Sequence, residues 1–301
     1  MRLAITGGTG FVGSHLLEVA LAARHRVTAL TRRDQPPRDH LDWIAGDFQD
    51  REALRRLVDG ADAIIHVAGT INAPNAAGFD KGNVQGTLAM LAAATAGGVR
   101  RFVHVSSLAA REPKLSLYGG SKAKAEELVH SSGLDWAIVR PPAVYGPGDK
   151  ETLELFRMAK LGLMLMPPKG RVSVIHADDL ARLLLALAGP DIPSSILIEA
   201  DDGKPGGWSH REFARALAAA VGTRPAILSS PGILLRAAAH LDQWWRGEKA
   251  KLTTDRAAYF SHRNWVVEPK RACPPQIWKP QIDTLQGLTL TADWYRAQGW
   301  L

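Results

Sequence analysis

The chain has 301 residues, 46% of them hydrophobic and 22% charged, a globular composition that excludes disordered and collagen-like proteins. Its one cysteine, Cys273, cannot form an internal disulfide, and no Cys/His cluster has the spacing of a zinc site. No apolar run approaches the roughly 18 residues that a membrane-spanning helix needs. We therefore expect a cytoplasmic protein without stable membrane insertion. The net charge of +7 comes from scattered basic residues, which suits a small anionic ligand and argues against a nucleic-acid partner.

Residues 1 to about 140 alternate short apolar runs with segments of helical periodicity. The expected strands are 3–6, 26–30, 43–45, 63–67, 102–106 and 137–140, and the expected helices include 12–23, 83–96 and 116–131. Strands that alternate with helices form a parallel sheet, and right-handed crossovers place helices on both of its faces. We therefore predict an α/β fold with a doubly wound parallel sheet, a Rossmann domain, over residues 1–149.

The composition changes after Arg140. Prolines and glycines break the alternation at 141–142, 146–148 and 167–168, and six of the nine tryptophans follow residue 240. We predict a smaller, mainly helical lobe over residues 150–301 that binds the substrate, although later segments can return to the sheet. The amphipathic segment 233–246 is expected to lie in the core, over a pocket or at a dimer contact, with a membrane surface as the alternative.

A glycine-rich segment, Thr6-Gly7-Gly8-Thr9-Gly10-Phe11-Val12-Gly13, lies where the first strand turns into the first helix. Gly7, Gly10 and Gly13 allow a tight turn, close approach of the backbone to a pyrophosphate and close packing of helix on strand. Phe11 and Val12 begin the helix, whose first N–H groups are available to an anion. The pattern predicts a dinucleotide-binding loop, and the alternative is a glycine-rich turn without a ligand.

The residues after the second strand bear on which dinucleotide binds. The chain reads Arg32-Arg33 where NAD-binding proteins carry an acidic residue for the ribose. Two guanidinium groups can bind a 2′-phosphate through charge-assisted hydrogen bonds, whereas a carboxylate would repel it. We predict NADP (NADPH) as the cofactor, with NAD less favoured. In the alternative, Arg32 and Arg33 are solvated and Asp34 contacts the ribose.

Tyr118 and Lys122 are one helical turn apart and share a face of the helix that follows the fifth strand. Ser106 and Ser107 end that strand at its carboxyl edge, where open α/β sheets bind ligands. A tyrosine that exchanges a proton near neutral pH needs its pKa lowered from about 10, and a nearby lysine ammonium group together with an oxidised nicotinamide would lower it. The arrangement predicts a proton-transferring tyrosine assisted by a lysine, with a serine hydroxyl on the substrate oxygen.

Taken together, these motifs resemble the extended short-chain dehydrogenase/reductase family, which includes NAD(P)-dependent epimerases, dehydratases, hydroxysteroid dehydrogenases and dihydroflavonol-type reductases. The resemblance covers the whole chain. Besides the glycine motif and the Tyr118/Lys122 pair, it is carried by the segments 46–48, 66–69, 83–87, 105–107, 140–148, 174–180 and 287–296.

The resemblance implies a role for each site residue. It makes Tyr118 the general acid/base, Lys122 its pKa-lowering partner and a hydrogen-bond donor to the ribose, and Ser107, rather than Ser106, the donor to the substrate oxygen. The remaining cofactor contacts that it implies, mostly through the backbone, are Asp47 and Phe48 beside the adenine, Ala68 and Gly69 along the cleft, and Pro141 and Val144 at the nicotinamide. Asn83 matches a helix asparagine of the family, with a purely structural role as the alternative.

Two departures from the sugar-nucleotide enzymes of the family bear on the reaction. Only residues 108–117 separate Ser107 from Tyr118, so a long substrate loop is absent, and Arg32-Arg33 favour the cofactor of reductive metabolism. We predict an NADP-dependent oxidoreductase that interconverts a ketone or aldehyde and an alcohol on a small organic substrate. The alternatives are a nucleotide-sugar epimerase/dehydratase and a non-catalytic NADP-binding protein.

Two further features leave alternatives open. His176 with Asp178 and Asp179 could be drawn as a metal site, but an aspartate before an apolar-periodic segment more often caps a helix, so we predict no metal. A homodimer is compatible with the sequence, which does not fix the oligomeric state.

Overall fold

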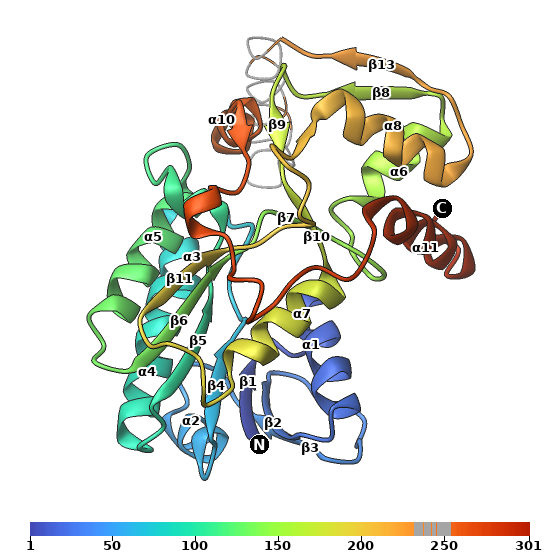
Figure 1. The fold of residues 1–301 in the computed structure, drawn as a ribbon. Helices are drawn as coiled ribbons and strands as arrows, with labels where there is room; N and C mark the ends of the chain where they lie inside the picture. The colour runs from blue at the N-terminus through green and yellow to red at the C-terminus, as the bar shows by residue number, and fades with distance from the viewer. Residues whose placement is uncertain (232–236, 238–241, 243–244, 246–253) are drawn as a thin grey trace. The chain divides into compact units, whose positions relative to one another are not determined.

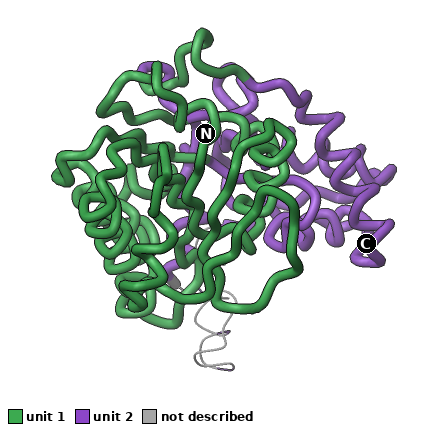
Figure 2. Tube along the Cα trace, turned by 90° about the horizontal axis from the view of Figure 1, so that it is seen from below, with its two compact units in different colours: residues 1–141, 178–199, 271–279 green, residues 142–177, 200–270, 280–301 purple. Residues whose placement is uncertain are grey.

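The computed structural model describes residues 1–231, 237, 242, 245 and 254–301, which divide into two compact units. The first unit consists of residues 1–141, 178–199 and 271–279, and the second of residues 142–177, 200–270 and 280–301 (Figure 2). The second unit begins at Pro142, a few residues before the boundary predicted near 150. Two later segments, residues 178–199 and 271–279, belong to the first unit. The sequence analysis left open that later segments return to the sheet domain.

A seven-stranded parallel sheet forms the centre of the first unit, with strand order β11-β6-β5-β4-β1-β2-β3 (Figure 1). Its strands are β1 (Arg2–Thr6), β2 (Arg26–Thr31), β3 (Leu41–Ala45), β4 (Ala63–His66), β5 (Arg101–Val105), β6 (Asp135–Arg140) and β11 (Ile196–Glu199). The predicted doubly wound α/β fold is confirmed, and all six predicted strands are present. The seventh strand, β11, was not predicted.

Helices cover both faces of this sheet (Figure 1). They are α1 (Phe11–Ala22), α2 (Arg51–Val58), the short α3 (Ala76–Phe79), α4 (Gly86–Ala96), α5 (Leu117–His130) and α7 (Ala177–Leu187). Residues of α2, α4 and α5 share one apolar core with the strands, built around Leu57, Ile64, Met90, Phe102 and Val129. The helix predicted over 83–96 is divided, because residues 80–85 form a π-helical turn before α4 begins.

The second unit combines helices with several small sheets. The helices whose bounds are described are α6 (Leu153–Lys160), α8 (His210–Val221), α10 (Thr254–Ser261) and α11 (Thr284–Ala297). Its strands are β7 (Ala143–Tyr145), β8 (Leu163–Met166), β9 (Arg171–Val172), β10 (Val174–His176), β12 (Trp208–Ser209), β13 (Ala226–Ser229) and β14 (Asn264–Trp265). The core includes Tyr145, Phe156, Leu217, Leu288 and Tyr295. Apart from residues 237, 242 and 245, the segment 233–246 singled out by its amphipathic pattern lies outside the described residues.

Candidate active site and dinucleotide site

The glycine-rich loop between β1 and α1 is packed so closely that side chains would collide there. Gly7 has a φ of +76°, and a Cβ atom on it would lie 2.7 Å from the backbone nitrogen of Ala68. A Cβ atom on Gly13 would collide with the carbonyl oxygen of Gly7. Gly10 precedes α1 without a side-chain cap, so no side chain of its own occupies the N–H groups at Phe11 and Val12. The loop has the close packing and the open helix terminus that a pyrophosphate requires.

The loop after β4 lies beside the buried end of Lys122. A Cβ atom on Gly69 would lie 3.0 Å from Asn83 Oδ1 and 3.6 Å from Lys122 Nζ. Asn83 is buried; its Oδ1 accepts a hydrogen bond from Thr70 N at 2.7 Å, and its Nδ2 donates to Ser121 Oγ at 2.8 Å. These contacts tie the β4 loop to α5, which agrees with the structural role considered for Asn83. The structure thus brings two predicted cofactor contacts, Gly69 and Lys122, close together.

The structure brings Ser107 and Tyr118 together as well. Ser107 follows β5 and is buried, its Oγ accepts a hydrogen bond from Ala109 N at 3.2 Å, and its hydroxyl is near enough to lower the pKa of Tyr118 in the first turn of α5. Ser116 caps this helix by accepting a hydrogen bond from Gly119 N at 3.0 Å, so α5 begins just before the tyrosine. One turn further along, Lys122 Nζ donates to the carbonyl oxygen of Val105 at 2.6 Å, which holds the lysine against the end of β5.

Burial dominates the electrostatics of this pair. It lowers the pKa of Lys122 to about 8, against the attraction of the Glu126 carboxylate, which raises it. Burial raises the pKa of the Tyr118 phenol, and the hydrogen bond to Ser107 lowers it. The net direction of the Tyr118 pKa is upward, because removing the phenolate from water outweighs the stabilisation by its neighbours in this chain. Tyr118 is therefore held in its protonated form. The lowering that the sequence predicted depends on an oxidised nicotinamide as well as on Lys122, and it stays a prediction.

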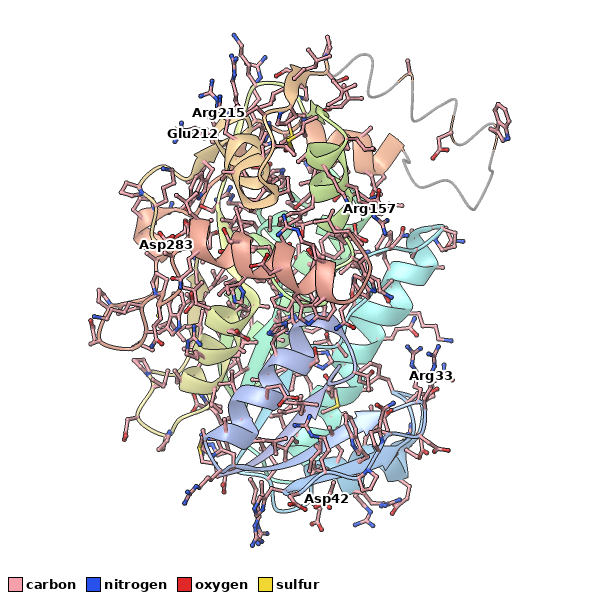
Figure 3. All side chains as sticks on the ribbon, turned by 90° about the vertical axis from the view of Figure 1, so that its right-hand side faces the viewer. Arg33, Asp42, Arg157, Glu212, Arg215 and Asp283 are labelled. Carbon is pink, nitrogen blue, oxygen red and sulfur yellow. The ribbon has the colours of Figure 1, made fainter. Side chains whose placement is uncertain are left out.

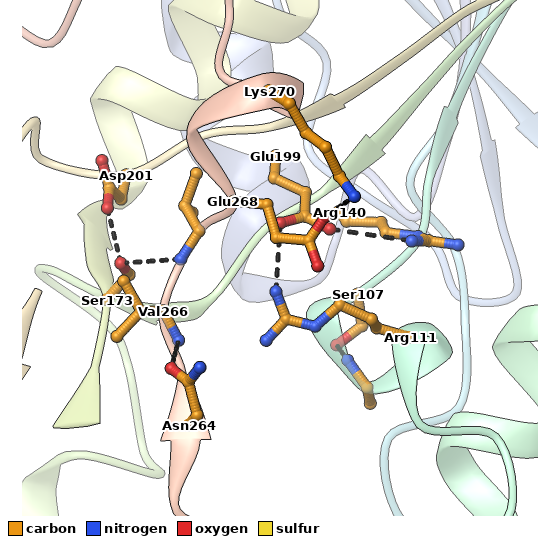
Figure 4. A network of polar contacts seen from close by, with 12 residues as sticks. Ser107, Arg111, Arg140, Ser173, Glu199, Asp201, Asn264, Val266, Glu268 and Lys270 are labelled. Carbon is orange, nitrogen blue, oxygen red and sulfur yellow. Dashed lines mark hydrogen bonds and ion pairs between the residues drawn. The ribbon is translucent and has the colours of Figure 1, made fainter. Parts of the chain in front are cut away.

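A chain of largely buried charges lies next to these residues, and Figure 4 shows the part of it around Glu199. Ser106 Oγ donates to Glu126 at 2.5 Å, and the Arg140 guanidinium makes two hydrogen bonds to the same carboxylate, at 2.8 and 2.6 Å. Glu199, fully buried at the end of β11, lies 3.6 Å from Arg140 and 3.3 Å from Arg111, and Figure 4 shows both arginines directed toward it. With its hydroxyl bound to Glu126, Ser106 is less suited than Ser107 to hold a substrate.

Sequence reasoning missed this network, although part of it left a signal. Glu126 follows Lys122 by four residues, so that it continues the helix face of Tyr118 and Lys122. The partner Glu199 is contributed by the strand that was not predicted, and no local pattern points to it.

The two arginines that predicted NADP lie on the loop after β2. Both side chains are exposed, and neither guanidinium is paired with a described residue; Figure 3 shows Arg33 at the surface. The hydroxyl of Thr31 donates to Arg33 O at 2.7 Å and accepts from Arg33 N at 3.2 Å, which fixes the turn that carries them. Asp34, the alternative contact for the ribose, is exposed on the same loop.

The remaining predicted cofactor residues occupy different environments. Asp47 is exposed, and its carboxylate accepts from Gln49 N at 2.8 Å; the Phe48 ring packs edge-on against His66, with centroids 5.6 Å apart. Pro141 is buried, and its carbonyl accepts from Leu108 N at 3.0 Å. Val144 lies on β7 in the second unit. The roles that the resemblance gave to these four residues stay predictions.

The aspartates considered as metal ligands have other partners. Asp178 and Asp179 lie in the first turn of α7; the first contacts His15 Nδ1 at 2.5 Å, and the second accepts from Arg182 at 2.7 Å. Within the described part of the chain, no group of three or more His, Cys, Asp or Glu residues could hold a metal ion. The same residues contain no helix that is both long and apolar enough to cross a bilayer.

Comparison with known proteins defines the class. The profile of the NAD dependent epimerase/dehydratase family matches residues 3–193. A ceramide reductase from Caulobacter vibrioides is 38% identical over 99% of this chain and 96% of its own length. A 4-hydroxy-2-methyl-3-oxo-4-farnesyl-3,4-dihydroquinoline-1-oxide ketoreductase from Stigmatella aurantiaca is 30% identical over 82% of this chain and 81% of its own length.

A solved structure shares the fold. The Bordetella bronchiseptica enzyme WbmG, in complex with NAD, superposes with a TM-score of 0.77 at 21% identity, over 100% of this chain and 95% of that one. The chain therefore belongs to the NAD-dependent epimerase/dehydratase family of extended short-chain dehydrogenases/reductases, as the resemblance implied. It is an NAD(P)-dependent oxidoreductase of that type.

Proposed function

We propose that this protein is an NADP-dependent reductase that interconverts a ketone or aldehyde and an alcohol. The observation that carries the proposal is the meeting of Ser107, Tyr118 and the buried Lys122 at the carboxyl end of β5. This geometry offers a proton and a hydrogen bond to one oxygen atom, which is what a carbonyl needs when it is reduced. Both relatives described above are named as reductases.

The residues around the glycine-rich loop fit a dinucleotide. Gly7 and Gly13 leave no room for side chains and Gly10 leaves the start of α1 uncapped, so the backbone there can approach a pyrophosphate. Arg32 and Arg33 are exposed and available to a 2′-phosphate. When bound, NADPH supplies the hydride that reduces the carbonyl carbon.

The protein's own groups act on the oxygen. Negative charge develops there as the carbonyl is reduced, and the Ser107 hydroxyl can stabilise it by donating a hydrogen bond. The Tyr118 phenol, held protonated by burial, then gives its proton to the oxygen. Lys122, with a pKa of about 8, is mostly protonated at neutral pH, and its positive charge favours the tyrosinate that remains.

The relative that matches nearly the full chain supports a lipid substrate. Because a ceramide reductase is 38% identical across 99% of this chain, a ketone on a ceramide-like lipid is the substrate class we assign. The second unit, predicted to bind the substrate, would accommodate it. A cytoplasmic location and a homodimer stay part of the proposal as expectations from the sequence.

The test is NADPH oxidation with a panel of carbonyl compounds that includes a ceramide-derived ketone and short-chain ketones and aldehydes. Tyr118→Phe should lower turnover by about 10²- to 10⁴-fold while leaving NADPH affinity nearly intact, since the phenol acts on the substrate oxygen. Tyr259→Phe, which removes a hydroxyl in the second unit, is the matched control and should retain activity.

Two results would contradict the proposal. If the Tyr118→Phe variant keeps more than about a tenth of wild-type turnover with chemistry rate-limiting, Tyr118 is not the acid. If the wild type reduces none of the carbonyls but interconverts sugar-nucleotide epimers, the site assignment stands and the assigned reaction is wrong.

A further inference from the structure

The outer face of a small sheet in the second unit carries exposed leucines. β8 and β13 pair in parallel, which sets Leu228 beside Leu165. Side chains alternate along a strand, so every second residue of β8 enters the core, while Leu163, Leu165 and Leu228 point outward and are 45 to 54% exposed. Leu161, between α6 and β8, is 83% exposed. We call Leu161, Leu163, Leu165 and Leu228 the leucine face.

Three arginines lie beside this sheet. Arg211 and Arg215 on α8 and Arg224 just before β13 line one shallow surface groove, and their guanidinium groups form no ion pair with a described residue. The acidic residue between the first two, Glu212, is engaged elsewhere: its carboxylate accepts from Ser209 N at 2.7 Å in the capping box of α8. Figure 3 shows Arg215 and Glu212 on the outer side of this helix. The groove therefore carries positive charge without a partner.

The size of the leucine face argues against a second copy of the chain as its occupant. Each strand has four residues, which at about 3.3 Å per residue gives a length of roughly 13 Å, and paired strands lie about 5 Å apart. Together with Leu161, which lies outside both strands, the face covers on the order of 100–200 Å², against about 800 Å² per partner in a standard protein interface. A two-fold interface centred here would also bring the same arginines of both copies near one another.

An anionic bilayer suits both features. Apolar side chains insert between lipid headgroups, and binding grows with the apolar area that is buried and with the attraction between basic residues and anionic lipids. Arginine can bind a lipid phosphate with two hydrogen bonds while its aliphatic part stays in apolar surroundings. Lys160, exposed at the end of α6 next to Leu161, adds a further positive charge to the same region.

We propose that the second unit docks peripherally on an anionic lipid bilayer through the leucine face, with Arg211, Arg215 and Arg224 on the lipid phosphates. This surface association goes beyond the reductase activity proposed above and does not depend on it. It involves no membrane-spanning segment.

The test is co-sedimentation of the full chain with vesicles of phosphatidylcholine, with and without phosphatidylglycerol. The wild type should bind the vesicles that contain phosphatidylglycerol, and less so at high salt. The triple variant Arg211→Gln/Arg215→Gln/Arg224→Gln should lose on the order of 100-fold in affinity, since each basic residue near an anionic surface contributes several-fold. Leu163→Ser/Leu165→Ser/Leu228→Ser should lose at least about tenfold.

Matched controls separate the surface from net charge and general hydrophobicity. Arg24→Gln/Arg51→Gln/Arg56→Gln removes the same charge from exposed positions of the first unit and should keep vesicle binding. Leu290→Ser, at an exposed leucine of α11, should keep it as well. Circular dichroism and NADPH titration establish that every variant is folded.

Several results would overturn the proposal. The proposal fails if the wild type does not bind anionic vesicles, or if the arginine and leucine variants bind them as tightly as the wild type does. It fails as well if the control variants lose as much vesicle binding as those variants. Analytical ultracentrifugation tests the competing occupant: a dimer that the leucine variants dissociate, without vesicle binding, would assign the face to a second copy.

Discussion

The two units depart from the usual distribution of polar and apolar side chains in opposite directions. The first unit buries charges, with Lys122, Glu126 and Glu199 all inside it, whereas the second exposes leucines along β8 and β13. Burying a charge costs free energy unless it is paired, whereas exposed leucines gathered on one face leave apolar area that a partner could bury. In the first unit the unusual residues are buried ionisable side chains, whose pKa values burial shifts. In the second unit the unusual residues are exposed leucines, which are available to a partner.

The largest expected effect is on the buried charges of the first unit. Arg140→Met leaves Glu126 and Glu199 buried without their shared partner, and breaking a buried ion pair from one side costs about 3–5 kcal/mol of unfolding free energy. Urea denaturation measures the loss. Arg55→Met is the control, since its pair with Glu52 is exposed, and it should leave the urea midpoint almost unchanged. Similar midpoints for the two variants would show that the buried network does not support the first unit.

A second effect concerns two stacked histidines in the interior of the first unit. Burial lowers the pKa of His66 to about 3 and that of His104 well below its usual value, and the positive charge of Lys122 lowers both further. Both rings stay neutral in the folded protein but take up protons in the unfolded chain below its pKa of about 6.5. Their stabilisation is therefore fully present above that pH and is lost as the pH falls toward 3.

The expected size of the pH effect follows from linkage. Between pH 7.5 and pH 5, each buried histidine should remove about 2 kcal/mol of unfolding free energy. His104→Leu should lessen this loss by about half, because no described group is hydrogen-bonded to either ring nitrogen of His104 and an apolar side chain of similar size fits there. Chemical denaturation across this pH range measures it. An unchanged pH dependence in the variant would contradict the idea that His104 is held neutral.

A smaller effect concerns the choice of dinucleotide. We expect NADPH to bind at least about tenfold more tightly than NADH, because Arg32 and Arg33 can form charge-assisted hydrogen bonds with a 2′-phosphate. Fluorescence titration of the two cofactors measures the ratio, and Arg32→Ala/Arg33→Ala should remove the preference while NADH affinity stays the same. Equal affinities in the wild type, or a preference that survives both substitutions, would favour the alternative in which Asp34 contacts the ribose of NAD.

The smallest expected effect is on the unfolding free energy when an exposed leucine of the second unit is replaced. Leu165→Ser should change the unfolding free energy by no more than about 0.5 kcal/mol, because the side chain is already exposed and contributes little to the core. Leu217→Ser, at a fully buried position of α8, should cost several times more. Thermal denaturation of the two variants measures the contrast. A large loss from Leu165→Ser would mean that the leucine face is part of the fold rather than a free surface.

Local sequence patterns were sufficient to predict the central sheet of the first unit and part of its candidate active site. Six strands of the central sheet follow from short apolar runs between helical segments, and the glycine spacing anticipates the tight packing at Gly7 and Gly13. The pairing of Ser107 with Tyr118 could be expected, because parallel strands end at the same edge of a sheet and the tyrosine begins the next helix. In each case the signal lies within a few neighbouring residues.

The sequence by itself determined the family, the parallel sheet and the candidate reacting groups, since each rests on residue type and short-range spacing. Only the tertiary structure decided that β11 completes the sheet and supplies Glu199, since β11 pairs with β6 across a long intervening segment. Only the tertiary structure could give the direction of the Tyr118 pKa as well, because it depends on how far the fold removes the phenol from water. The spacing of residues in the sequence indicates which side chains can come together, whereas the fold determines how far each is buried and which charges lie beside it.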